Sequence, residues 1–206
     1  KLEPVAERVG PEPVVLSGID SVGQYGGTWH RVCISTTDIG VNHEYLSADL
    51  LGRFSPYGYP IVPHVAKSWE HSEDHKEWIF HLRRGMRWSD GHPFTAEDII
   101  YWWEWDIKYF EGKYTSSGSS SSQPGPGFPV FMRVEGQPGE IVMVDQHTVK
   151  FVFPMPNPFF LQRLVSSGTY LKYHSPRHYM EQFHPEIGNR DVIDDMMARL
   201  NISSPE

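Results

Sequence analysis

The eleven histidines are the first residues to test for chemistry, because paired imidazoles bind transition metals. His71 and His75 are four residues apart, and His174 and His178 have the same spacing. That spacing suits a metal ion on a helix, where both rings lie on one face. The first pair flanks a polar turn, and Pro176 places His174 outside the helix of the second. We therefore expect hydrogen-bonding or solvated histidines, with no metal site and no cofactor.

Signatures of catalysis are missing from the sequence. It contains no G-x-S-x-G elbow, dinucleotide fingerprint or Walker motif, and the single Cys33 has no recognisable signature around it. Cys33 is more simply a buried thiol on a strand. The carboxylate pairs Glu97 with Asp98 and Asp194 with Asp195 fall in helix first turns or on polar faces, where they suit the helix dipole and solubility. We expect a protein that is not an enzyme.

The aromatic residues offer binding chemistry instead. Seven tryptophans and ten tyrosines include the run Y-W-W-E-W at 101–105, and one helix cannot bury all of these rings on a single face. With Trp103 facing the core, Trp102 and Trp105 point elsewhere. They either pack against neighbouring elements or line a groove where rings stack on a sugar or clamp apolar side chains. Trp29, on a predicted strand nearer the N-terminus, could likewise either pack against neighbouring elements or line a groove.

The elements that position these residues can be predicted from periodicity. Alternation predicts a first strand from Thr28 to Ser35, and apolar spacing predicts a short helix that begins at Asn42 and ends at Gly52. Two hairpins follow. Their predicted strands are Val65–His71 with Glu77–Arg83, and Glu140–Asp145 with His147–Phe153.

A helix between the hairpins carries the tryptophan run. Thr95 begins a capping-box pattern with Asp98 at the third helical position, and Ile99, Trp103 and Ile107 then form one apolar stripe. The sequence predicts that this stripe faces the core.

The remaining segments are a loop and three helices. The Ser-, Pro- and Gly-rich stretch 115–127 cannot bury enough apolar surface for a regular element. Helices are predicted over Phe159–Val165, from the cap pair Ser175-Pro176 through Phe183, and over Asp191–Leu200 with Val192, Met196 and Leu200 in register.

Composition fits an acidic globular protein. The 206 residues are 39% hydrophobic and carry a formal net charge of −8, which argues against a nucleic-acid partner. No stretch approaches the length of an apolar membrane span, and the first residues lack the apolar core of a signal peptide. We expect that any export signal was removed or never present.

Four motifs in a fixed order resemble the family 5 extracellular solute-binding proteins, the peptide, nickel and oligosaccharide receptors of bacterial ABC importers. They are Y-G-G-T, V-A-K-S-W-E, F-H-L-R-R-G-M-R-W-S-D-G-H-P-F-T-A-E-D-I and V-D-Q-H-T-V-K-F-V-F-P, within residues 25–184. The order of the motifs is stronger evidence than any single match. The turn and helix-start residues of the third motif identify it as scaffold.

The resemblance implies a fold as well as a class. It implies a mixed α+β chain of the α/β class that forms part of lobe I of a two-lobed, periplasmic-binding-protein-like fold. Residues 1–40 and 151–206 would form the base of that lobe, and 41–150 an inserted α+β subdomain. The second lobe has no counterpart, so we expect an N-terminal piece of a receptor.

The resemblance also implies a function. Such a receptor captures oligopeptides or oligosaccharides outside the cytoplasmic membrane, in the periplasm or at the cell surface, and delivers them to permease subunits. Ligand contacts are expected from the loop after the first strand and from the end of the long helix, with Trp29 as a further candidate. The residues are Trp29, Thr36, Thr37, Asp38, Trp105 and Tyr109.

Two other readings remain open. A receptor for nickel or a metal chelate belongs to the same family, and a non-transport interaction domain could reuse the fold.

Overall fold

The computed structural model describes residues 4, 9–16, 18–21, 23, 24, 26–28, 30, 32, 34, 50–111, 129–166 and 174–202. Cys33, most of the predicted helix from Asn42 and the stretch 115–127 lie outside these residues. Two predictions near the N-terminus are corrected. Val32 and Ile34 are 96% and 97% exposed and lie in no strand, and Gly52 begins a strand instead of ending a helix. Alternation of residue types does not by itself establish a strand, because strand formation also depends on how the rest of the chain is arranged.

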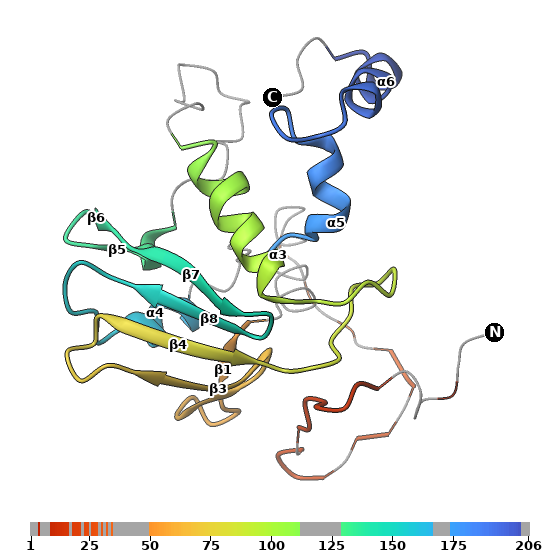
Figure 1. Ribbon diagram of the computed structural model, residues 1–206. Helices are drawn as coiled ribbons and strands as arrows, with labels where there is room; N and C mark the ends of the chain where they lie inside the picture. Colours follow the sequence, from red (N-terminus) through yellow and green to blue (C-terminus); the bar gives the residue numbers. More distant parts are fainter. Residues whose placement is uncertain are drawn as a thin grey trace.

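A four-stranded antiparallel sheet is the centre of the fold (Figure 1). Its spatial order is β3, β4, β8, β7, so each predicted hairpin forms one half and β4 pairs with β8 in the middle. Both hairpins are confirmed. The strands are β3 (Ala66–His71), β4 (Glu77–Leu82), β7 (Glu140–Asp145) and β8 (Thr148–Val152).

One face of the sheet is apolar because alternate residues of each strand point to the same side. The register places Trp78 opposite Phe151, and Phe151 opposite Ile141, in one row across three strands. Phe80 and Val149 form the next row, and both are fully buried. The predicted inward positions of both hairpins are therefore confirmed.

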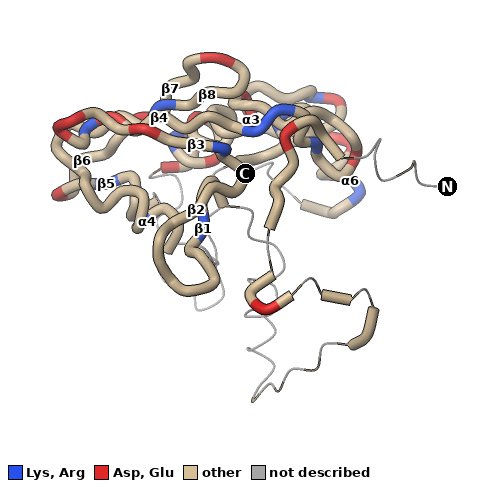
Figure 2. The backbone as a smooth tube through the Cα atoms, turned by 90° about the horizontal axis from the view of Figure 1, so that it is seen from below, with Lys and Arg blue, Asp and Glu red and all other residues tan. Residues whose placement is uncertain are grey.

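The other face of the sheet carries polar side chains. Lys150 of β8 pairs with Glu77 of β4 at 3.1 Å, and His81 lies 3.6 Å from Glu70 of β3. Figure 2 shows Lys and Arg spread among the acidic residues along the chain.

Helix α4 (Phe160–Ser166) covers the apolar face, behind the sheet in Figure 1. Its Phe160 is fully buried, and the ring centroids of Phe151 and Phe153 lie 5.0 and 4.8 Å from it. The predicted helix Phe159–Val165 is confirmed. Smaller elements complete this side: β1 (Gly52–Phe54), β2 (Ile61–Pro63), η3 (Val130–Met132), β5 (Arg133–Val134) and β6 (Gln137–Pro138).

Helix α3 (Ala96–Tyr101) begins with the predicted capping box. The Thr95 hydroxyl accepts a hydrogen bond from the Glu97 amide at 3.3 Å, and Asp98 accepts one from the Thr95 amide at 2.9 Å. These bonds satisfy amides that have no partner inside the helix.

The helix continues as a π-helix, η2 (Trp102–Lys108), in which the Tyr109 amide bonds to the Glu104 carbonyl. The predicted stripe of Ile99, Trp103 and Ile107 is buried. Trp102 is buried too, at 3% exposed, and its ring centroid lies 6.1 Å from that of Trp103. For Trp102 the structure decides in favour of packing.

The last helices are α5 (Arg177–Met180), η4 (Glu181–Phe183) and α6 (Arg190–Leu200). Two details differ from the prediction. Ser175 does not cap α5, because its hydroxyl hydrogen-bonds to Asp106. In α6 only Ile193 is buried, while Leu200 is 62% exposed, so the predicted stripe is not the packed face.

The mixed α+β class is confirmed. Strand β8 crosses residue 150, where the predicted division between base and inserted subdomain falls. Among the residues described here, no helix combines the length and apolar character of a membrane span.

Candidate solute-binding crevice

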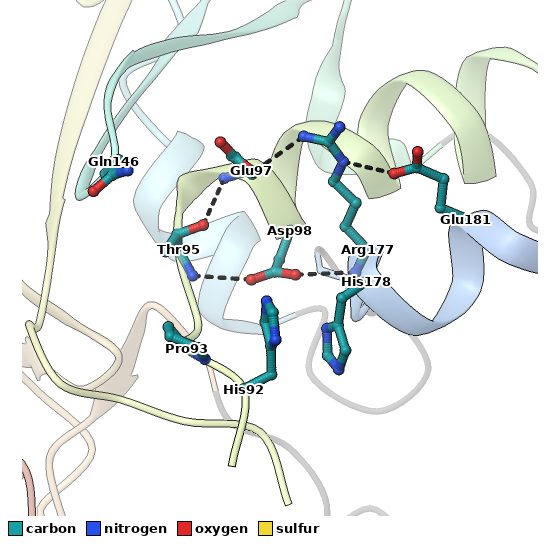
Figure 3. Close-up of a pocket in the computed structure, with 9 residues that line it drawn as sticks. All are labelled: His92, Pro93, Thr95, Glu97, Asp98, Gln146, Arg177, His178 and Glu181. Carbon is teal, nitrogen blue, oxygen red and sulfur yellow. Dashed lines mark hydrogen bonds and ion pairs between the residues drawn. The ribbon is translucent and has the colours of Figure 1, made fainter. Parts of the chain in front are cut away.

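Two adjoining hollows lie between α3 and the α5–η4 segment, which stand side by side in Figure 1. The polar hollow has a volume of about 320 Å³ and is drawn in Figure 3. It is lined by His92, Pro93, Thr95, Glu97, Asp98, Gln146, Arg177, His178 and Glu181.

Asp98 fixes the wall of the polar hollow. One carboxylate oxygen accepts from the Thr95 amide at 2.9 Å, and the other accepts from the Arg177 amide at 3.0 Å (Figure 3). The Asp98 carbonyl also accepts from the Ser175 amide at 3.1 Å. The residue is only 3% exposed, so one buried carboxylate joins the starts of α3 and α5.

Arg177 lies between the two hollows. Its guanidinium contacts Glu97 at 3.0 Å and Glu181 at 2.8 Å. The hydrogen bond that Arg177 donates to Glu181 is the largest cause of a raised pKa of Arg177, and burial opposes it. One cation between two carboxylates leaves a net negative charge, together with acceptor oxygens that can receive donors from a ligand.

A second cluster lies at the mouth of the polar hollow. His178 Nε2 and Asp90 Oδ2 are 2.6 Å apart, and the Asp90 carboxylate also accepts from the His92 amide at 2.9 Å. The rings of His92 and His178 stack with centroids 3.9 Å apart. The hydrogen bond from His178, followed by that from the His92 amide, lowers the pKa of Asp90 below its ordinary 3.8. The cluster ties the W-S-D-G turn, residues 88–91, to α5.

This contact predicts a pH dependence of stability. Because the folded pKa of Asp90 lies below the unfolded one, its stabilisation is present above about 3.8 and is lost as the pH falls through the folded pKa. Asp90→Asn should therefore lower the melting temperature at neutral pH, and the difference from wild type should shrink below pH 4. Melting curves from neutral to acidic pH measure it, with Ser89→Ala as control. A difference that is unchanged at all pH values would contradict the assignment.

The apolar hollow, of about 390 Å³, continues along α3 and shares Glu97, Arg177 and Glu181 with the polar one. Its other lining residues are Ile100, Tyr101, Trp105, Met143 and Ile187. Burial raises the pKa of Tyr101, which keeps the phenol neutral. The crevice thus joins a charged end to an apolar wall, the combination that a small-molecule site requires.

The predicted site residues are only partly brought together. Trp105 lines the apolar hollow. Tyr109 instead packs on the Trp105 ring at 6.1 Å and on His184 at 4.4 Å, behind the lining. Trp29, Thr36, Thr37 and Asp38 lie outside the described residues.

Sequence reasoning missed Arg177 and the stacked pair His92 and His178. Arg177 contacts Glu97 from 80 positions along the chain, and no local pattern links the two residues. The rings of His71 and His75 are tilted against each other, with centroids 4.5 Å apart, and lie beside Trp78. Within the described segments, no group of three or more His, Cys, Asp or Glu residues could hold a metal ion.

Comparison with known proteins gives a family. Residues 60–188 match the family model described as bacterial extracellular solute-binding proteins, family 5 Middle. This segment includes all of the residues that line the two hollows, and it covers more than half of the chain. The chain belongs to family 5 of the bacterial extracellular solute-binding proteins.

Named relatives of this family 5 chain bind different solutes. The chain is 28% identical over 205 residues to the periplasmic alpha-galactoside-binding protein of Rhizobium meliloti, covering 90% of this chain and 28% of that protein. It is 34% identical over 116 residues to the periplasmic oligopeptide-binding protein OppA of Escherichia coli, covering 54% of this chain and 20% of OppA. The chain therefore spans well under a third of the length of either relative.

Solved structures agree with the family 5 assignment. An oligopeptide-binding protein OppA superposes with a TM-score of 0.75 and 33% identity, over 95% of this chain and 28% of that one. The periplasmic binding protein MelB of Agrobacterium fabrum C58, in complex with stachyose, gives a TM-score of 0.55 at 22% identity, over 91% of this chain and 29% of MelB. The second likeness shows a shared fold.

Proposed function

We propose that the protein carrying this sequence is the solute-binding component of an ABC importer. It captures oligopeptides or oligosaccharides outside the cytoplasmic membrane, in the periplasm or at the cell surface, and delivers them to a permease. The observation that carries this proposal is the family 5 match over residues 60–188. Relatives named for alpha-galactoside and oligopeptide binding support both ligand classes. In this role the protein holds its ligand without making or breaking a bond.

In the proposed receptor this chain belongs to lobe I. Residues 1–40 and 151–206 form the base, and 41–150 form the inserted subdomain. The crevice lies where the two parts meet, since α3 belongs to the subdomain and α5 to the base. Such a position suits a receptor that closes on its ligand by a hinge motion.

The crevice suits an uncharged or cationic group better than an anionic one. Arg177 is already paired with Glu97 and Glu181, so the groups that remain available to a ligand at this point are carboxylate oxygens, which accept hydrogen bonds. Sugar hydroxyls, peptide N–H groups and an ammonium group all donate to such oxygens. Trp105 supplies an apolar wall on which a sugar ring or an apolar side chain can lie. We further propose Trp29, Thr36, Thr37 and Asp38 as contacts from the segment before residue 50, with Tyr109 supporting Trp105.

Replacement of Trp105 tests the proposed function. Trp105→Ala should weaken solute binding by about tenfold or more, the usual cost of truncating an aromatic contact at a binding site. Isothermal titration calorimetry with short peptides and with alpha-galactoside oligosaccharides measures the effect. Tyr57→Ala is the matched control, since Tyr57 is 78% exposed on the β1–β2 turn and should leave affinity unchanged. Equal affinities of wild type and Trp105→Ala would remove Trp105 from the site.

A further inference from the structure

A third hollow, of about 560 Å³, lies beside the W-S-D-G turn and shares no residue with the crevice. One side is formed by residues 10–14, called the N-terminal arm below, and the other by residues 83–91, which follow β4 and include the turn. It is lined by Gly10, Glu12, Pro13, Val14, Arg83, Arg84, Gly85, Met86, Arg87, Trp88, Ser89 and Gly91.

Three arginines line this hollow, and none of them forms an ion pair with a carboxylate in the described part of the chain. Arg83 donates to the carbonyls of His64 and Pro13 at 2.6 and 3.2 Å. Arg87 donates to the Gly91 carbonyl at 2.7 Å. These acceptors are neutral, so the bonds orient Arg83 and Arg87 and leave their charges uncompensated.

Glu12 is the carboxylate that lines the hollow, and it is already engaged. Its oxygens accept from the Arg84 amide at 2.8 Å and from Lys67 Nζ at 3.0 Å. The hydrogen bond from the Arg84 backbone amide, followed by that from Lys67, lowers the pKa of Glu12, so Glu12 stays ionised and paired. With Lys67 balancing Glu12, the arginines make the hollow cationic in a chain of net charge −8.

The arm that closes this hollow is held by backbone contact. A Cβ on Gly10 would come within 2.7 Å of the Gly85 carbonyl oxygen, and Gly85 itself has a φ of +79°. Side chains at these two positions would push the arm away from the segment that carries the arginines. The glycines therefore keep the two walls together.

We propose that this hollow binds a phosphate group. A guanidinium offers a planar fork of donors that matches the oxygens of a phosphate group. Several arginines around one cavity can also balance the charge of a phosphate, which is larger than the single charge of a carboxylate. Arg83 and Arg87 are pre-oriented by carbonyls, and Arg84 supplies a third cation. The group is either free, as inorganic phosphate or a soluble phosphomonoester, or part of a lipid headgroup.

Titration with inorganic phosphate at low ionic strength tests the proposal. Wild type should bind saturably, and Arg84→Gln and Arg87→Gln should each weaken binding by about tenfold, the value of one charge-assisted hydrogen bond. Arg190→Gln on α6, whose guanidinium pairs with Asp194 on an exposed surface, should leave affinity unchanged. Saturable binding that both hollow variants retain would overturn the proposal, as would equal weakening by Arg190→Gln.

Vesicles distinguish the two sources of phosphate. Co-sedimentation with vesicles of equal parts phosphatidylcholine and phosphatidylglycerol, competed by inorganic phosphate and lost in Arg84→Gln, would assign the site to a headgroup. Phosphate binding in the titration without such co-sedimentation would assign it to a soluble phosphate. Failure of both assays with wild type would overturn the proposal.

Discussion

Phe160→Ala should be the most destabilising single substitution in the sheet core. Phe160 is fully buried, and its ring lies within about 5 Å of Phe151 and Phe153 and 5.7 Å of Trp78. Truncation of a buried phenylalanine removes these contacts and leaves a cavity, at a cost of about 3–5 kcal/mol in the free energy of unfolding. Because domains are stable by only about 5–15 kcal/mol, this loss is a large fraction of the total.

Urea denaturation at 25 °C measures the loss, with Phe159→Ala as the matched control. Phe159 precedes Phe160 in the chain but is 63% exposed, so its truncation should change the free energy of unfolding little. Phe160→Leu should fall between wild type and Phe160→Ala. If the two alanine variants were equally stable, α4 would not cover the sheet as described.

Asp98→Ala should produce the second largest loss of stability. It removes the acceptor of the Thr95 and Arg177 amides, at a site only 3% exposed. An unsatisfied buried amide costs about 1–3 kcal/mol, and two are created, so we expect a loss of about 2 kcal/mol or more. Solute affinity should also fall, because this carboxylate holds α5 against α3 at the crevice.

Glu97→Ala is the control, one residue away in the same helix turn. Glu97 pairs with Arg177 through side chains that are both nearly half exposed, and exposed pairs contribute only about 0–1 kcal/mol. Asp98→Asn should be intermediate, since the amide retains one acceptor oxygen. Denaturation of the three variants under identical conditions checks the order. A loss in Glu97→Ala as large as in Asp98→Ala would refute the role of Asp98.

What the sequence predicted well was local. The hairpin strands are given by alternation around short turns, and the start of α3 by Thr95 and Asp98 three residues apart. What it missed depends on distant partners. The role of Asp98 in holding Arg177 joins residues 79 positions apart. The burial of Trp102 depends on elements that pack around the helix, and a stripe read from helical spacing does not include them.

The candidate site shows the same division. Trp105 could be proposed from the tryptophan run, because a helix with rings on several faces must present one away from the core. Arg177 and Glu181 could not, because only packing of α5 on α3 brings them to the crevice. Ser175 illustrates the limit: its position before a proline suggests a helix cap, while the fold uses its hydroxyl to reach Asp106.

The central claim is that solute binds in the crevice between α3 and α5. Hydrogen–deuterium exchange of the protein that carries this sequence, with and without a saturating peptide or alpha-galactoside oligosaccharide, tests it most directly. We predict slower exchange on ligand binding in segments 96–108 and 177–188, and unchanged exchange at the β1–β2 turn. Ligand-dependent protection confined to segments outside the crevice would contradict the claim.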